Sequence, residues 1–197
     1  MLTGRLSRWA RRRHAGPGAS DAIALAGRLL QGLDARLTHS AAVAAQVNRV
    51  THLVEPEWRS PLNDAAWLHD IGYSPEVVLT GFHPLDGARW LRDHHWPAET
   101  CRLVAWHTEP FEEALLYGLD VELASEFDHP PRLAAVALAW GDLTSSPTGE
   151  RWDAERRLAD ILDRYPPGSL VHEATRASLP AMRAAVQEIE DLLSDRR

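Results

Sequence analysis

The sequence predicts an all-α fold that forms a single helical domain. Apolar residues recur at spacings of three and four along most of the chain, and no convincing run alternates apolar and polar residues as a strand would. A length of 197 residues suits one domain with a sizeable core. We therefore expect a flexible basic arm over residues 1–20 and one domain over residues 21–197.

Capping and helix-breaking residues divide the domain into its helices. Ser20 is expected to cap the first helix, Ser60 and Pro61 supply the N-cap and first position of the third, Gly72 ends the third, and Pro97 opens the fifth. The expected helices cover about 21–33, 35–54, 61–71, 83–93, 97–107, 110–118, 133–140, 150–165 and 168–195.

Two of these helices carry distinctive apolar patterns. The segment 133–140 is apolar on all sides, which requires a central position in the fold. The last helix has a clean apolar stripe made of Met182, Val186, Ile189 and Leu193. Such a stripe is typical of packing against the core, and a homodimer contact is the alternative.

Composition argues against several classes of protein. The formal net charge is −7, although residues 1–20 carry five arginines and no acid, so the expected domain is acidic and poorly suited to nucleic acid. No apolar run is long enough to span a membrane, and no export signal follows the arginines. Cys101 is the single cysteine, which excludes an intramolecular disulfide and a cysteine-based zinc cluster. We expect Cys101 to be buried and the protein to be cytoplasmic.

An adjacent histidine and aspartate, His69 and Asp70, close the apolar segment 65–71 and raise the question of function. A buried carboxylate costs several kcal/mol unless it is paired, hydrogen-bonded or bound to metal. The residues that could converge on this pair are His39, His83, His107 and Asp142.

Four of these residues form a plausible ligand set for one metal ion. Neighbouring helical residues point about 100° apart, so His69 and Asp70 can reach the same ion only across a helix end, which the Gly72 stop provides. His39 and Asp142 would complete the set. Two neutral imidazoles and two carboxylates balance a divalent cation and leave positions open, as in a catalytic rather than a structural site.

The two remaining histidines leave two alternatives open. If His83 and His107 turn toward Asp70, this aspartate could bridge two ions about 3.5 to 4 Å apart, an arrangement that activates water and clamps a phosphoryl group. Otherwise they would lie in the outer shell of one metal, where they would bind phosphate or donate a proton to the leaving group. A separation above about 8 Å from the Asp70 carboxylate would exclude the two-ion site.

The ordered set of His39, then His69 and Asp70 followed by Ile-Gly, then Asp142 resembles the signature of the HD-domain superfamily of metal-dependent phosphohydrolases. The segment Thr-Gly-Phe-His83-Pro-Leu-Asp-Gly-Ala is similar to the one that bears an additional histidine in dinuclear branches of the family. The resemblance spans about residues 35–145 and implies an all-α core, beyond which the helices over 150–195 are additions.

The resemblance implies hydrolysis of a phosphate ester by a metal-activated water. His39, His69, Asp70 and Asp142 would hold the first ion, with His83 and His107 joining if the site is dinuclear, and Asp70, His83 and His107 would act in catalysis. The cofactor would be one or two divalent ions of Mn, Fe, Co, Ni, Zn or Mg per chain. The extended Gly-Tyr-Pro motif of cyclic-di-GMP phosphodiesterases is missing, which argues against that substrate.

Three functions follow, of which the first is favoured: a phosphohydrolase acting on a small phosphorylated molecule such as a nucleotide. The second is a di-iron oxygenase, because a few HD-fold enzymes use a similar six-residue set. The third is a regulatory module that retains the site without turnover, against which the intact ligand set argues. Because the chain has no lysine, cations that bind the substrate must be arginines, and the candidates are Arg36, Arg89, Arg92 and Arg102.

Overall fold

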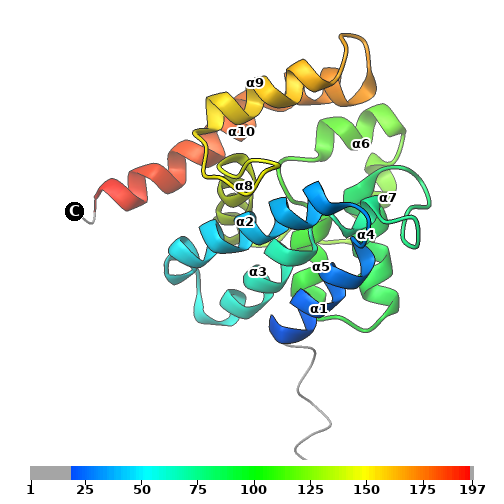
Figure 1. Ribbon diagram of the computed structural model, residues 1–197, viewed down its shortest axis with the longest axis horizontal. Coiled ribbons are helices and arrows are strands. Elements are labelled where there is room, and N and C mark those ends of the chain that lie inside the picture. The colour runs from blue at the N-terminus through cyan, green and yellow to red at the C-terminus, as the bar shows by residue number, and fades with distance from the viewer. Residues whose placement is uncertain (1–18, 196–197) are drawn as a thin grey trace, which may run out of the picture.

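The computed structural model describes residues 19–195, and these residues form ten α-helices, two short 3-10 helices and no β-strand (Figure 1). The all-α prediction is therefore confirmed. The α-helices are α1 (Ala19–Leu29), α2 (Asp34–Val50), α3 (Pro56–Leu68), α4 (His83–Asp93), α5 (Ala98–Ala105), α6 (Phe111–Tyr117), α7 (Asp120–Glu126), α8 (Arg132–Leu143), α9 (Ala154–Arg164) and α10 (Leu170–Ser194). The 3-10 helices are η2 (Thr51–Leu53) and η3 (Ile71–Tyr73).

Several predicted boundaries were wrong. Ser20 lies inside the first turn of α1 rather than at its N-cap, so the arm predicted over 1–20 is already helical at its end, and the rest of it lies outside the described residues. The second helix stops at Val50 and continues as η2. The helix α7 was not predicted at all, because its single buried residue, Leu123, produces no periodic pattern.

The third helix begins earlier than predicted. Pro56, not Pro61, occupies its first turn, and Trp58 is buried there. Pro61 lies inside the helix, where it offers no N–H to the carbonyl of the exposed residue Glu57. The burial of Trp58 against the core therefore outweighs the loss of one hydrogen bond in a solvent-facing turn.

The helix α8 is central, as its uniformly apolar sequence predicted. Its residues from Ala134 to Trp140 are mostly buried, and it packs against α2, α3, α5 and α10. Gly141 permits the close approach to α2, since a Cβ there would lie 2.6 Å from Val47 Cγ2. The apolar stripe of α10 packs against the core of the same chain, with Met182 and Ile189 buried.

The C-terminal helices complete the domain. Asp153 caps α9 and Ser169 caps α10 through side-chain hydrogen bonds to the first turns. The two helices lie together along one edge of the molecule, and α10 also packs on α6 and α8 (Figure 1). Cys101 is buried, as predicted. Within the described residues, no helix has the length and apolar character needed to cross a membrane.

Candidate metal centre

All six predicted ligand residues come together at the ends of different helices. His39 lies in α2, His69 and Asp70 follow α3, His83 begins α4, His107 lies just after α5, and Asp142 is in the last turn of α8. The sequence placed both His107 and Asp142 at the ends of their helices. Asp142 does lie in the last turn of α8, which extends to Leu143, whereas α5 stops at Ala105, two residues before His107.

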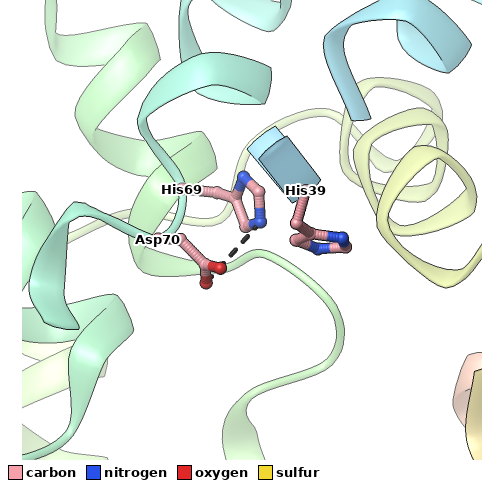
Figure 2. A group of neighbouring side chains, drawn as sticks. All are labelled: His39, His69 and Asp70. Atoms are coloured by element: carbon pink, nitrogen blue, oxygen red, sulfur yellow. Dashed lines mark ion pairs between the residues drawn. The ribbon is translucent and has the colours of Figure 1, made fainter. Parts of the chain in front are cut away.

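His39, His69 and Asp70 form the first group of potential ligands. Each offers one ligand atom, and these atoms lie within 4.8 Å of one another. Figure 2 shows the His69 ring directed at the Asp70 carboxylate, with Nε2 at 3.6 Å from Oδ1. All three residues are buried. The side chains of the consecutive residues His69 and Asp70 can approach the same position because α3 ends between them, with His69 as its C-cap.

A second group of potential ligands consists of Asp70, His83 and His107, whose ligand atoms also lie within 4.8 Å of one another. His83 Nε2 lies 3.8 Å from Asp70 Oδ1 and 3.1 Å from His107 Nε2. These separations are well inside the limit of about 8 Å for a two-ion site. Asp70 belongs to both groups, so it occupies the position that a bridging carboxylate would require.

Two of the histidines are held in one tautomer by the backbone. The Nδ1–H groups of His69 and His107 donate to the main-chain carbonyl oxygens of Ala66 and Val104. In the neutral ring the other nitrogen, Nε2, then carries the lone pair. Such backbone contacts are the ones that orient histidines in metal sites.

Asp142 joins the first group through His39. Its Oδ1 lies 2.9 Å from His39 Nε2, and its Oδ2 accepts a hydrogen bond of 2.6 Å from the Thr108 hydroxyl. Thr108 adopts a positive φ of 55°, which is uncommon for a residue other than glycine. The segment after His107 is therefore bent in a way that brings Thr108 onto Asp142.

Arg36 contacts the other oxygen of the shared aspartate. Its Nη1 donates to Asp70 Oδ2 at 3.0 Å, and its guanidinium carbon lies 3.6 Å from the centroid of the Tyr73 ring. Tyr73 in turn stacks on His83 with a centroid distance of 4.1 Å. Arg36 was one of four arginines considered from the sequence, and it is the one that reaches the site.

Burial and neighbouring charges hold the site residues in the ionisation states that a cation site needs. Burial lowers the pKa of His69 to about 4, against the opposing effect of Asp70. Burial and the neighbouring His107 lower the pKa of His83 as well. Burial alone would raise the pKa of Asp70, but His69 and Arg36 bring it well below the usual range. Burial alone would also raise the pKa of Asp142, but the hydrogen bond from His39 together with the charges of His39, His69 and Arg157 brings it well below the usual range.

A divalent cation fits these residues. His69 Nε2 is buried without a hydrogen-bond partner among the described residues, which is costly for a polar atom with nothing to bind. His39 Nε2 and the Asp142 carboxylate lie 2.9 Å apart, so both would reach the same cation. Imidazole and carboxylate donors suit the first-row divalent metals.

A pocket opens beside the six residues, and the C-terminal helices supply much of its far wall. Its charged lining includes Arg36, Arg157, Arg164 and Glu113, and burial raises the pKa of Glu113 to about 7. Arg157 and Arg164, on α9, were missed from the sequence. Their spacing with Ile161, which also lines the pocket, places all three on one helix face, and this periodicity was the available signal.

The other arginines considered from the sequence lie elsewhere. Arg89 and Arg92 form ion pairs with Glu126, and Arg102 donates to the backbone carbonyls of Asp128 and His129. These three arginines do not line the pocket.

The loop before α4 is built to position His83. The carboxylate of Asp86 accepts hydrogen bonds from the backbone N–H groups of Leu79, Thr80 and Gly81 at 2.9 to 3.1 Å. On the other side, Gly72 lies so close to α4 that a Cβ would be 2.0 Å from the His83 carbonyl oxygen. His83 is thus held between η3 and its own loop.

Comparisons with protein-family models, with curated proteins and with solved structures found no match to this chain. Its function is therefore inferred from the geometry and chemistry of the site.

Proposed function

We propose that this chain is a metal-dependent phosphohydrolase of the HD-domain type, in which an activated water attacks a phosphate ester of a small molecule. The observation that carries the proposal is the pair of largely buried ligand groups that share Asp70. A carboxylate common to two histidine-bearing groups is the arrangement expected of a two-ion hydrolytic centre. The orphaned Nε2 of His69 supports a metal at this place.

Each residue has a distinct role in the proposed reaction. His39, His69, Asp70 and Asp142 would hold one ion, and Asp70, His83 and His107 a second. Bound divalent metal would supply a water of lowered pKa and polarise the phosphoryl oxygen. Arg36 orients Asp70, and Thr108 orients Asp142, through the hydrogen bonds described above.

The charge of the pocket favours a phosphorylated substrate. Arg36, Arg157 and Arg164 all line it, although the chain as a whole is acidic. Guanidinium groups bind phosphate oxygens in a bidentate manner. A nucleotide remains one candidate within this class.

Replacing the shared aspartate tests the proposal. Asp70→Ala should abolish metal-dependent phosphate release and reduce the bound metal, because both ligand groups lose a member. The measurement combines metal analysis of the purified chain with a panel of phosphate esters and nucleotides supplemented with manganese, cobalt, nickel or magnesium. Asp163→Ala, at an exposed carboxylate of α9, is the matched control and should leave activity unchanged.

Two outcomes would contradict hydrolysis. Bound iron with a mixed-valence paramagnetic signal, and no phosphate release with any metal, would indicate a di-iron oxygenase instead. A metal-loaded chain without any turnover would indicate a regulatory module.

A further inference from the structure

A buried arginine of α9 faces the metal centre with part of its hydrogen-bonding capacity unused. The Arg157 side chain is 7% exposed and lines the pocket together with Asp142. Its Nη2 forms an ion pair with Asp142 Oδ1 at 3.7 Å, but this distance is too long for a hydrogen bond. An arginine is rarely buried unless its donors are satisfied.

The unused donors of Arg157 lie on one edge of its guanidinium. Nη1 donates to Asp160 Oδ2 at 3.1 Å. The buried Nε has no acceptor among the described residues, and Nη2 faces the Asp142 oxygen at 3.7 Å. Nε and Nη2 together form a planar fork that matches two oxygens of a phosphate group. The missing acceptors point to a ligand.

The other two arginines of the pocket are already engaged. Arg36 donates to Asp70 at 3.0 Å and stacks on Tyr73. Arg164 pairs with Asp160 at 2.9 Å, and its side chain is 41% exposed. Arg157 is thus the pocket arginine that combines burial with an unsatisfied fork.

We propose that Arg157 binds the phosphoryl oxygens of the substrate through its Nε–Nη2 edge. This inference rests on the proposed function and assigns the substrate-binding cation to a helix beyond the segment that resembles the HD core. Ile161, Ala174 and Met182 line the same pocket, so the organic part of the substrate meets an apolar wall on α9 and α10. The Asp142 carboxylate lies 3.7 Å from Arg157, so a bound divalent cation would offset its negative charge and favour phosphate binding.

The test measures binding of inorganic phosphate to the full chain by calorimetry, with and without manganese. Arg157→Gln should weaken phosphate binding about tenfold or more, since a charge-assisted hydrogen bond contributes that much. Arg157→Lys, which keeps the charge without the fork, should show an intermediate loss. Arg156→Gln, at the neighbouring exposed arginine, is the control and should bind phosphate like the wild type.

Manganese affinity distinguishes direct binding of phosphate by Arg157 from an indirect effect of Arg157 through Asp142. Neither Arg157 variant should lose manganese affinity, because Arg157 makes no hydrogen bond to Asp142 and removing a positive charge beside a metal ligand does not weaken cation binding. Parallel loss of manganese and phosphate would overturn the proposal, since Arg157 would then act through Asp142. If Arg157→Gln does not fold, the lysine variant alone decides, and wild-type phosphate affinity in it would overturn the bidentate contact.

Hydrolysis and phosphate binding can fail separately. Absence of phosphate binding to the manganese-loaded wild type would overturn the role of Arg157, whether or not the chain turns over. Phosphate binding that depends on Arg157 in a chain without hydrolysis would support the anion site and contradict the proposed reaction.

Discussion

At the scale of single residues, the site depends on Asp70 being able to serve two groups at once. One oxygen faces His69 and His83, at 3.6 and 3.8 Å, while the other accepts from Arg36. A carboxylate so surrounded keeps its charge although it is buried, and its pKa lies well below the usual range. These contacts explain why Asp70 can be ionised although it lies at the end of an apolar segment.

A glycine near the site is equally constrained by its neighbours. We expect Gly72→Ala to destabilise the fold by about 1–3 kcal/mol, as overpacking commonly does, because the added Cβ would clash with the His83 backbone. Urea unfolding measures this, and metal analysis should show reduced binding because His83 is displaced.

The matched control for this change is Gly27→Ala in α1, where no atom lies within 4 Å of the added Cβ. It should be neutral or stabilising by about 0.5–1 kcal/mol, since alanine favours the helix. Equal stability of the two alanine variants would contradict the close approach of η3 and α4.

The ligand residues were predictable one by one, whereas Arg157 was not. A histidine or aspartate in an apolar helical segment requires compensation, and this local pattern is enough to single out His69 and Asp70. An arginine in a charged helix such as α9 is ordinarily solvated, so its sequence gives little reason to expect burial. Asp160 lies three residues further along the same helix, but the approach of Arg157 to Asp142 becomes visible only when α9 is packed.

At the scale of elements, the packing of α1 on α3 buries a carboxylate that lies outside the site. Asp64 is 1% exposed, and its Oδ1 has no hydrogen-bond partner among the described residues. Burial, with a smaller contribution from Asp21, raises the pKa of Asp64 from 3.8 to about 6. The folded state therefore holds a proton on Asp64 at pH values where the unfolded chain has lost it.

The raised pKa of Asp64 predicts that removing its charge stabilises the folded protein, and that the effect depends on pH. Stability contributed by protonated Asp64 is present at low pH and is lost as the pH rises from about 4 to about 6. Asp64→Asn avoids that loss, so it should stabilise the protein by about 1–3 kcal/mol at pH 8 and change little at pH 4.

Urea unfolding at the two pH values measures the effect, and Asp163→Asn at an exposed position provides the control. An Asp64→Asn variant that is no more stable at pH 8 would show that the buried carboxylate is satisfied in another way.

The helix boundaries show where tertiary packing overrides the local sequence patterns that predict helix ends. The central helix α8 was recognisable because an apolar surface on all sides has no alternative to burial. The start of α3 was misplaced, since the anchor is the buried Trp58 rather than the Ser60 and Pro61 pair. Tertiary contacts, which a local pattern does not contain, decided that boundary.

At the scale of the whole molecule, the candidate metal centre joins helices that are far apart in the sequence. Its candidate ligands come from α2, from the ends of α3 and α8, and from the starts or ends of α4 and α5. A ligand that binds only the folded arrangement stabilises the entire domain by mass action.

Metal removal is therefore expected to lower thermal stability. At a free metal concentration about 100 times Kd, the gain is about 2.7 kcal/mol, which corresponds to roughly 5–10 °C in Tm for a chain of this size. Thermal unfolding of the chelator-treated chain, before and after adding manganese, measures it. Asp70→Ala should show a much smaller shift, and a wild-type Tm independent of metal would contradict the proposed centre.

The sequence by itself determined the helical class, the central position of α8 and the six polar residues that need compensation, because these follow from periodicity and the cost of burying charge. Tertiary structure decided that Asp70 is shared between two groups, that Arg36 reaches it and that Arg157 faces the same pocket. These are distances between side chains from separate helices, and packing alone sets them. His69 and Asp70 are adjacent in the sequence, but the other residues of the site come from different helices.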